Sequence, residues 1–370
     1  MRARAGEKVV IRVYGSRISY YAGKLEAYLR YRGIEYELRS MIDHARKILA
    51  GAGAVQSPVV QLEDGRWMSD STPILAWFEA QREGPSIYPE DPAMRFIAIL
   101  LEDHADEWLW RPAMHYRWSH RQDREHASGV LADELLSRLP LPRFAKRWGV
   151  ARRQLGGFVL RDGVSASTRE HVERTAMAAF DGLEAILAER PFLLGERPTI
   201  VDFGFFGPMF RHFSQDPTSA ELMRQRAPRA YTWVARMWEA RTQPDSAEIL
   251  SKVDGPLATL LREACETHLV QLRENARAHA EGASHFSQDV QGCRYERLPV
   301  SRYRVWCLEE LRRHWQALDE MTQAVLRECL PEPGAAILWE HDPVTNSGYD
   351  AERRAPFNRA INVFGNGVPR

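Results

Sequence analysis

The sequence of 370 residues contains little cysteine, no excess of charge of either sign and no long apolar run. Its four cysteines all lie in the last third without a CxxC pair, which fits neither a zinc cluster nor a disulfide framework. Because 50 basic residues balance 50 acidic residues, we expect no nucleic-acid partner and no attraction to an anionic membrane. The most apolar stretch, residues 203–210, is far shorter than the ~20 residues of a membrane span, and the opening segment lacks the apolar region of a targeting signal. A cytoplasmic protein without a metal site is therefore expected.

The sequence is rich, by contrast, in the side chains that build a large core. Hydrophobic residues make up 44% of it, and there are 11 Trp, 12 Tyr and 14 Phe. A single core rarely grows beyond ~250–300 residues, so the length predicts two or three domains.

The first forty residues predict a strand, a helix and a second strand. Residues 9–14 form a β-branched run typical of a buried strand. Residues 20–32 carry apolar side chains at helical spacing, with Ser19 as N-cap and Gly33 as terminator. Residues 34–38 then alternate like a strand, which completes a βαβ unit.

A hairpin and another helix follow. Residues 57–68 contain a strand that opens with Ser57 and Pro58, a turn at Glu63-Asp64-Gly65 and a second strand. The polar run at residues 69–73 supplies N-cap residues and a proline ahead of an apolar helix.

This order of elements resembles the thioredoxin-like domain of glutathione transferases. That family carries Tyr, Ser or Cys at the start of its first helix, a cis-proline before its third strand, and an acidic residue followed by Ser at the start of its third helix. In this sequence the corresponding residues are Ser16 or Ser19, Pro58, Asp70 and Ser71. The residue before the proline is usually apolar in the family and is Ser57 here, although its main-chain groups can still pair with the cysteinyl part of glutathione.

The resemblance implies glutathione as co-substrate and a hydroxyl group that stabilises its thiolate. Lowering a thiol pKa of ~8.5 by about 2 units requires about 2.7 kcal/mol, which a hydroxyl donor and a helix N-terminus supply together. Ser19 is the preferred donor, and Ser16, Tyr20 and Tyr21 are the alternatives.

The resemblance also implies a binding site for the γ-glutamyl unit. Asp70 is expected to pair with its α-amino group, and Ser71 to bind its carboxylate at a helix N-terminus. Helix capping alone would explain Ser19, Asp70 and Ser71 without any ligand. The expectation of a glutathione site therefore rests on their combination with Pro58 and the order of elements.

Residues 93–253 predict an all-helical domain, because helical periodicity dominates and prolines mark its junctions. Residues 190–203 are similar to a motif of the family's C-terminal domain, in which Thr199 caps a helix and Asp202 reaches back to the turn. This capping box explains the polar residues of the motif, so we expect a structural role for it.

The first helix of this domain, residues 101–118, corresponds to the wall of the family's electrophile pocket, and Pro112 is expected to bend it. The candidates for the substrate pocket are Tyr20, Trp108, Arg111, His115 and Tyr116. A domain-interface helix with buried tryptophans would explain the same residues. A metal site of Asp103, His104 and Glu107 is disfavoured because no comparable pair of histidines accompanies them.

Residues 119–165 resemble an insertion relative to a minimal family member. They contain the densest basic segment, residues 143–153. At zero net charge a solvated helix face, or a patch that attracts anionic glutathione, is expected there rather than a nucleic-acid site.

The remaining residues extend beyond the usual family length. Residues 257–272 and 305–325 carry helical apolar stripes, and residues 286–300 predict a hairpin. The tail from Pro331 onward is expected to wrap over the body or a second subunit. The cysteines are interpreted as core residues, with Cys293 in the hairpin as the one to test for reactivity.

The sequence thus predicts an α+β protein with a thioredoxin-like domain over residues 1–88, an all-α domain over 89–255 and a mostly helical extension over 256–370. The expected activity is that of a glutathione-dependent transferase or lyase of the detoxification type, acting on a small hydrophobic electrophile in a homodimer. The absence of cysteine from the first two hundred residues disfavours thiol-transferase chemistry. A peroxide- or quinone-directed reductase would use the same glutathione site. The alternative from another class is a non-catalytic interaction or scaffolding protein with this fold.

Overall fold

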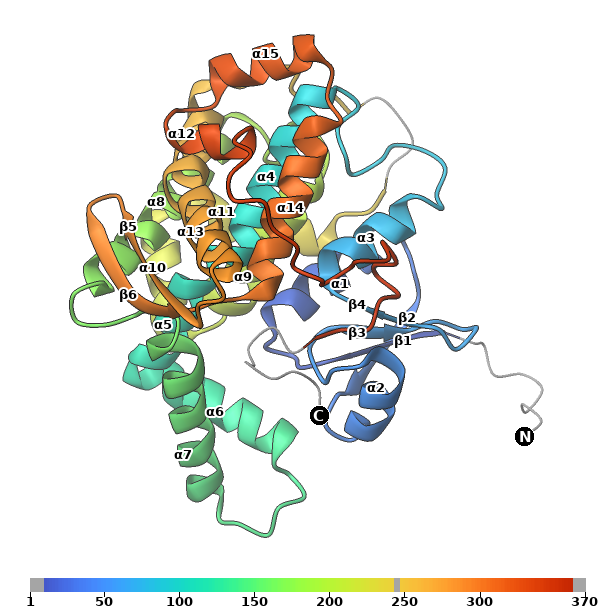
Figure 1. Ribbon diagram of the computed structural model, residues 1–370. Helices are drawn as coiled ribbons and strands as arrows, with labels where there is room; N and C mark the ends of the chain where they lie inside the picture. The colour runs from blue at the N-terminus through green and yellow to red at the C-terminus, as the bar shows by residue number, and fades with distance from the viewer. Residues whose placement is uncertain (1–9, 243–246, 362–370) are drawn as a thin grey trace.

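The N-terminal part of the computed structural model, which describes residues 10–242 and 247–361, is a four-stranded sheet with helices on both faces (Figure 1). The strand order is β2-β1-β3-β4, with β1 parallel to β2 and β3 antiparallel to both of its neighbours. Its elements are β1 (Ile11–Gly15), α1 (Tyr20–Tyr31), β2 (Tyr36–Ser40), α2 (Ala45–Ala52), β3 (Val59–Gln61), β4 (Trp67–Ser69) and α3 (Ser71–Glu79). The predicted thioredoxin-like arrangement is confirmed.

The ends of α1 have the predicted chemistry. Ser19 is the N-cap and accepts a hydrogen bond from the Ala22 N–H, while Gly33 has a φ of 63° beyond the C-terminus. The second strand begins at Tyr36 and not at Ile34, because the Ile34 N–H is bonded to the Leu29 carbonyl and still belongs to the helix end. Of the first predicted strand, Val9 lies outside the described residues.

The helical part that follows begins with two helices at an angle. α4 ends at Glu107 and α5 begins at Trp110, so the predicted bend falls ahead of Pro112, which sits in the first turn of α5 where its missing N–H costs nothing. The elements here are α4 (Pro92–Glu107), α5 (Trp110–Ser119), α6 (Arg121–Leu135), α7 (Arg143–Gln154), the π-helical segment η1 (Leu155–Leu160), α8 (Arg169–Glu189), α9 (Ile200–Pro208), the π-helical segment η2 (Met209–Phe213), α10 (Pro217–Arg226) and α11 (Pro228–Glu239).

The capping box of α9 is present as predicted. The Asp202 carboxylate accepts from the Thr199 N–H at 2.9 Å and from the Leu193 N–H at 2.8 Å, so it ties the start of α9 to the preceding turn. Asp202 is fully buried, which makes these bonds necessary for the fold.

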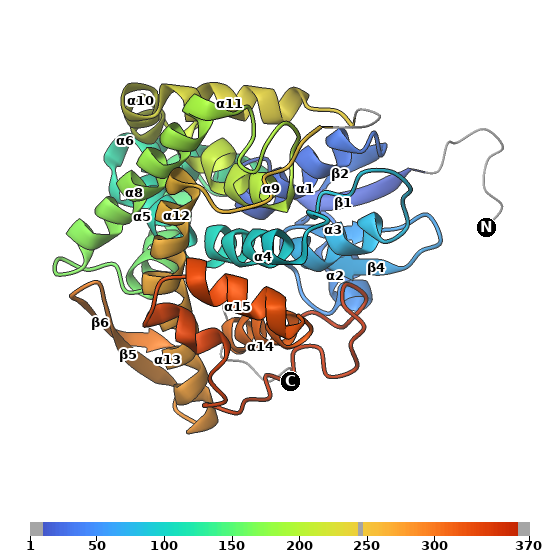
Figure 2. The ribbon, with the colours of Figure 1, turned by 90° about the horizontal axis from the view of Figure 1, so that it is seen from above.

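The extension is structured over its described length. Its elements are α12 (Gly255–Glu263), the π-helical segment η3 (Ala264–His268), α13 (Leu269–Ala280), β5 (His285–Val290), β6 (Cys293–Pro299), α14 (Arg302–Gln316), α15 (Glu320–Cys329) and the 3-10 helix η4 (Gly334–Leu338). β5 and β6 form the predicted hairpin. Figure 2 shows α4 between α9 on one side and α14 and α15 on the other, and the packing contacts agree.

One apolar core runs through all three parts of the chain. It joins Val13 under the sheet, Phe203 in α9 and Trp315 in the extension, while a smaller cluster fills the other face of the sheet under α2. The predicted boundaries at residues 88 and 255 fall between α3 and α4 and at the start of α12; they stay predictions, since the core crosses both.

The cysteines are free thiols, and Cys265 and Cys307 are buried in the core as expected. Cys293 is half-buried, and burial raises the pKa of its thiol, which works against the reactivity considered for it. Within residues 10–242 and 247–361, the helices are too short or too polar to cross a membrane.

Candidate active site

The predicted glutathione-site residues meet at one end of the sheet. β1 ends at Gly15, just before Ser16. The start of β3 lies beside the end of β1, because Val59 pairs with Tyr14, and the end of β4 lies beside the start of β3, because Ser69 pairs with Val59. Antiparallel pairing of β3 with its neighbours therefore brings the N-terminus of α1, the segment before β3 and the start of α3 together. The Ser57–Pro58 peptide at this edge is cis.

Ser19 has an unusual set of hydrogen bonds. Its Oγ accepts from the Ala22 N–H at 3.4 Å and from the Ser57 Oγ at 2.9 Å. These two bonds use both acceptor positions of the hydroxyl and leave its own hydrogen to donate. Ser19 is half-buried, so its hydroxyl remains partly accessible from the surface.

Ser16 is committed differently. Its Oγ donates to Oε2 of Glu134 at 2.5 Å, and the Arg17 N–H donates to Oε1 of the same carboxylate at 3.3 Å. Glu134 comes from the last turn of α6, 118 residues away in the chain, and the sequence carries no signal for this contact. Because Glu134 accepts its proton, the Ser16 hydroxyl is less available to a ligand than the Ser19 hydroxyl.

The phenol groups of Tyr20 and Tyr21 point to α4. The Tyr20 hydroxyl donates to the Ala105 carbonyl, and the Tyr21 hydroxyl donates to the Asp106 carbonyl at 3.0 Å. Burial raises the pKa of both phenols well above the ordinary value. Both groups hold α1 against α4 and have their protons in use.

Asp70 lies beneath the C-terminal extension. It precedes α3 with a φ of 75°, a left-handed conformation that Asp tolerates better than most residues. Its Oδ1 accepts from the Tyr303 hydroxyl and its Oδ2 from the Tyr349 hydroxyl, each at 3.1 Å. Burial raises the pKa of Asp70 to about 7. Ser71 follows as the first residue of α3 and is buried.

A buried lysine supports this end of the sheet. Lys24 is fully buried in α1, and its Nζ donates to Glu102, to Asp106 at 2.5 Å and to Thr72 at 2.9 Å. Burial alone would lower the pKa of Lys24, but the two carboxylates outweigh it and raise the pKa above the ordinary value. The ammonium group therefore stays charged and fastens α1 and α3 to α4.

The predicted substrate-pocket residues are not gathered in one place. Tyr20 packs edge-on against Trp110 at 5.8 Å between ring centroids. Trp108 and Arg111 lie under the extension, where the Arg111 guanidinium stacks 4.7 Å from the Tyr295 ring. His115 and Tyr116 lie further along α5, and the five predicted side chains are all buried. Their role in binding an electrophile stays a prediction.

Arg111 is held in that buried position by two partners. Its Nε donates to the Asp162 carbonyl at 2.7 Å, and its Nη2 donates to the Gln271 side chain at 2.5 Å. A guanidinium bonded in this way contributes to the packing of α5 against the extension.

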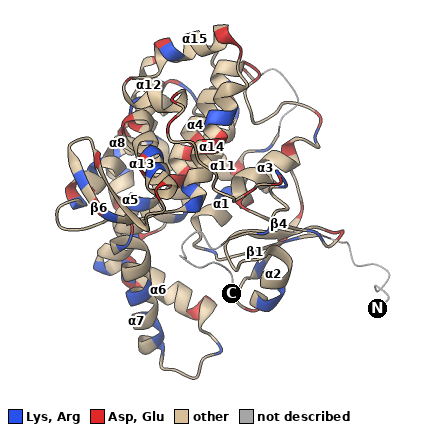
Figure 3. Ribbon diagram, in the orientation of Figure 1, with Lys and Arg blue, Asp and Glu red and all other residues tan. Residues whose placement is uncertain are grey.

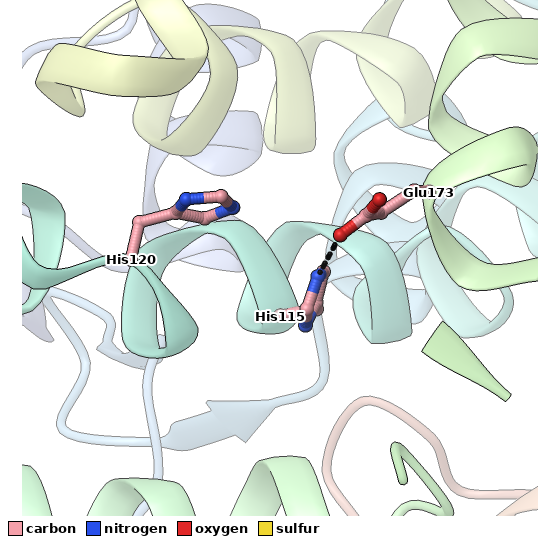
Figure 4. A group of neighbouring side chains, drawn as sticks. All are labelled: His115, His120 and Glu173. Carbon is pink, nitrogen blue, oxygen red and sulfur yellow. Dashed lines mark hydrogen bonds and ion pairs between the residues drawn. The ribbon is translucent and has the colours of Figure 1, made fainter. Parts of the chain in front are cut away.

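The two carboxylates considered for a metal have other partners, whereas His104 is buried and neither of its ring nitrogens has a hydrogen-bond partner within the part of the chain that the structure describes. Asp103 is bonded to His268 at 2.7 Å and Glu107 to Arg304 at 3.3 Å. Among the described residues a different group, His115, His120 and Glu173, places ligand atoms within 4.8 Å of one another (Figure 4). The His115 Nε2 is hydrogen-bonded to Glu173 at 3.0 Å, which links α5 to α8. The expectation of no metal stays a prediction.

The basic segment forms α7, and blue stretches of the ribbon in Figure 3 mark its Lys and Arg residues. With α6 it projects from the body (Figure 1), and Phe144 and Trp148 on it are exposed. Arg138, in the loop that joins the two helices, forms an ion pair with Asp43 of the N-terminal domain at 2.8 Å. The α6–α7 pair thus borders the same end of the sheet as Ser16 and Ser19.

A thioredoxin-like domain followed by an all-helical domain, with a serine at the N-terminus of α1 and a cis-proline before β3, defines a two-domain protein of the glutathione-transferase type. Residues 13–86 match the family profile of the glutathione S-transferase N-terminal domain, and residues 166–236 match that of the glutathione S-transferase C-terminal domain. The chain therefore contains the N- and C-terminal domains of a glutathione S-transferase, followed by a C-terminal extension. No curated protein matches the chain.

Several solved structures are similar to it. The β-etherase LigF from Sphingobium sp. strain SYK-6 is 18% identical with a TM-score of 0.44, over 62% of this chain and 94% of that one. A glutathione S-transferase from Rhodospirillum rubrum F11 is 17% identical with a TM-score of 0.40, over 68% and 92%. A glutathione S-transferase from Methylobacterium radiotolerans JCM 2831, in complex with glutathione sulfonate, is 19% identical with a TM-score of 0.36, over 65% and 99%.

Proposed function

We propose that the protein is a glutathione transferase or lyase in which the Ser19 hydroxyl donates a hydrogen bond to the glutathione thiolate. The proposal rests on the hydrogen bonds of the Ser19 hydroxyl. Its oxygen accepts from the Ala22 N–H and the Ser57 hydroxyl, so its own hydrogen is left to donate to a ligand. Ser16, Tyr20 and Tyr21 all donate to acceptors within the protein. The two matching domains support glutathione as the thiol.

The rest of the glutathione site follows from the same end of the sheet. The main chain of Ser57, the residue before the cis peptide to Pro58, is proposed to pair with the cysteinyl unit. The N-terminus of α3 at Ser71 is proposed to bind the γ-glutamyl carboxylate, and Asp70 the ammonium group beside it. The sulfur then lies near the N-terminus of α1, where the helix dipole adds to the Ser19 hydrogen bond.

In the proposed reaction the thiolate attacks an electrophilic carbon and the leaving group departs with the bonding electrons. We propose a hydrophobic electrophile because the aromatic start of α5 lies against the first turn of α1: the Trp110 ring stacks on Tyr21 at 5.7 Å and meets Tyr20 edge-on. A homodimer in a reducing, cytoplasmic compartment is part of the proposal, and the four free thiols are consistent with that compartment.

Ser19→Ala is expected to lower glutathione-dependent turnover about tenfold or more. A hydrogen bond to a charged group contributes about 1.5–3 kcal/mol, and about 1.4 kcal/mol corresponds to a tenfold change in rate. The measurement is kcat/KM with glutathione and an activated aryl chloride at neutral pH. Ser16→Ala is the matched control and should retain most of the activity, since the Ser16 hydroxyl donates to Glu134. Equal rates for Ser19→Ala and the wild type would show that Ser19 is not the donor.

The binding of S-methylglutathione, which has the γ-glutamyl ammonium but no free thiol, is expected to strengthen with pH. Asp70 has a raised pKa of about 7, so it is protonated below that pH and pairs with an ammonium only above it. The dissociation constant should fall about tenfold between pH 5.5 and pH 7.0, where the ammonium keeps its proton. Lys24 remains charged throughout, but Glu107, with a pKa also raised by burial to about 7, titrates in the same range.

The variant Asp70→Asn distinguishes the titration of Asp70 from that of Glu107. In this variant the pH dependence should disappear, because Glu107 alone does not contact the ammonium. A slope that persists in Asp70→Asn would assign the titration to another group and remove Asp70 from the proposed site.

One observation favours the non-catalytic alternative. Both carboxylate oxygens of Asp70 already accept hydrogen bonds from the Tyr303 and Tyr349 hydroxyls, which stand where the γ-glutamyl ammonium is expected to bind. A chain that has lost glutathione binding would use the fold as a scaffold. Calorimetry with millimolar glutathione discriminates between the two: an absence of binding favours the scaffold, and binding favours the enzyme.

A further inference from the structure

The last described part of the chain, residues 345–361, crosses from the extension to the N-terminal domain and is called the strap below. It has neither helix nor strand, and in Figure 1 it passes from α14 to α3 and the sheet. Its start is fastened to α14. The Ser347 hydroxyl and N–H donate to the Glu309 carboxylate at 2.7 and 2.8 Å, and the Arg302 Nε donates to the Ser347 carbonyl at 2.7 Å.

The far end of the strap lies on the edge of the sheet. The Ser69 N–H of β4 donates to the Pro356 carbonyl at 3.0 Å, and the Ala360 N–H donates to the Ala52 carbonyl at 2.8 Å. The Phe357 ring packs edge-on against Trp77 of α3, 5.4 Å between centroids. The strap therefore accepts the backbone N–H of Ser69, the residue directly before Asp70.

Between these ends the extension closes over Asp70 itself. The Tyr349 hydroxyl from the strap and the Tyr303 hydroxyl from α14 each take one carboxylate oxygen. The rings of Tyr303, Trp306 and Tyr349 pack on one another with centroids 4.9 to 5.5 Å apart. Rings at that spacing leave no room for an ammonium group between them.

We propose that the extension is an internal competitor of glutathione: the strap and Tyr303 occupy the ammonium subsite at Asp70, and glutathione binds when the strap is displaced. This inference rests on the function proposed above. An ammonium forms charge-assisted hydrogen bonds to the carboxylate, which are stronger than those of neutral phenols, so the ligand can take the place of the two hydroxyls. The closed strap then raises the apparent dissociation constant by the reciprocal of its open fraction.

The attachment of the strap suits such a switch. Its contacts with the N-terminal domain include two backbone hydrogen bonds, the Tyr349 hydrogen bond, the contacts of Phe357 with Trp77 and with Arg66, and the close approach of Arg359 and Ala360 to Gly53. Ser347 keeps the base of the strap on α14. Releasing a segment without helix or strand disrupts fewer interactions than unfolding an element of the core. The strap can thus open about Ser347 while α14 stays in place, which frees the Asp70 oxygen that Tyr349 occupies and leaves the ammonium to displace the Tyr303 hydroxyl alone.

The test is calorimetric titration of the full-length chain with S-methylglutathione at pH 7.0, in the wild type and three variants. Tyr303→Phe combined with Tyr349→Phe removes both hydroxyl donors and keeps the rings. Phe357→Ala loosens the strap at a point that does not contact Asp70. Tyr231→Phe, which deletes a hydroxyl on α11 that is bonded to Arg224, is the matched control.

The double variant and Phe357→Ala are each expected to bind at least about fivefold more tightly than the wild type, and Tyr231→Phe to bind like the wild type. Saturating ligand should also speed tryptic cleavage after Arg359, an exposed strap residue, in the wild type. Equal affinity in all four proteins, or weaker binding in the variants, would overturn the competitor and leave the proposed function standing. An absence of binding in all four would overturn both.

Discussion

A chain ending at residue 255 is expected to be insoluble when expressed. The extension contributes Leu260, Leu308 and Trp315 to the common core, and each fully buried side chain of this kind stabilises the fold by about 1.5–3 kcal/mol. Its loss would expose the partner surfaces of α4 and α8, against which α14 and α12 pack. An apolar surface of that extent on a soluble domain leads to aggregation.

The truncation also breaks a buried ion-pair network. Arg304 of α14 reaches Glu107 at 3.3 Å and Asp162 at 3.1 Å, and all three side chains are buried. The measurement is the soluble fraction and the elution volume in size-exclusion chromatography. A chain ending at residue 361 keeps every contact described above and serves as the control. A soluble, monodisperse and cooperatively folding chain of 255 residues would contradict the single-core description and restore the extension as a separate domain.

Lys24→Met is expected to lower the free energy of unfolding by about 3–5 kcal/mol, because removing one partner of a buried ion pair leaves an uncompensated charge. Lys24 faces Glu102 and Asp106, whose side chains are 3% and 7% exposed, so neither carboxylate can recover its hydration. Because methionine is similar to lysine in length and flexibility, the loss of stability reflects the missing charge more than a change in side-chain volume.

The measurement is denaturant-induced unfolding followed by circular dichroism. Lys47→Met is the control, because Lys47 is exposed and its Nζ contacts the Gln61 side chain at the surface; a change within about 0.5 kcal/mol is expected there. If the two variants lost equal stability, the buried cluster would not be the fastening that the geometry describes.

Local features of the fold could be predicted from the sequence because their physics is local. The Ser19 cap, the Gly33 terminator and the capping box of Thr199 with Asp202 each depend on residues within four positions of one another. The hairpin that opens after Pro58 follows from strand runs and a turn of three residues. Chain order then placed these pieces in a thioredoxin-like sheet.

The contacts that decide the chemistry of the site could not be predicted in this way. Glu134 meets Ser16 across 118 residues, and Tyr303 and Tyr349 meet Asp70 across 233 and 279 residues. No periodicity or capping pattern links such positions, because the packing of whole helices brings them together. The same reason explains why Trp108 and Arg111, predicted to line a pocket, lie beneath the β5–β6 hairpin of the extension.

The extension therefore changes how accessible the family's Asp-Ser pair is to a ligand. Asp70 and Ser71 occupy the positions that the family resemblance predicts, yet the carboxylate of Asp70 is bonded to residues that a chain of ordinary family length would lack. The wild-type protein is expected to bind glutathione more weakly than its own N-terminal site would allow. If the strap competes with glutathione as proposed, its position controls how much glutathione binds and therefore the activity.

We propose that Ser19 stabilises the thiolate of bound glutathione, and the pKa of that thiol tests this role without any choice of electrophile. The thiolate absorbance of saturating glutathione on the protein is titrated with pH in the wild type, Ser19→Ala and Ser16→Ala. We expect a thiol pKa about 1–2 units below ~8.5 in the wild type and in Ser16→Ala, and a return toward ~8.5 in Ser19→Ala. A pKa near ~8.5 in the wild type, or a rise in Ser16→Ala alone, would contradict it.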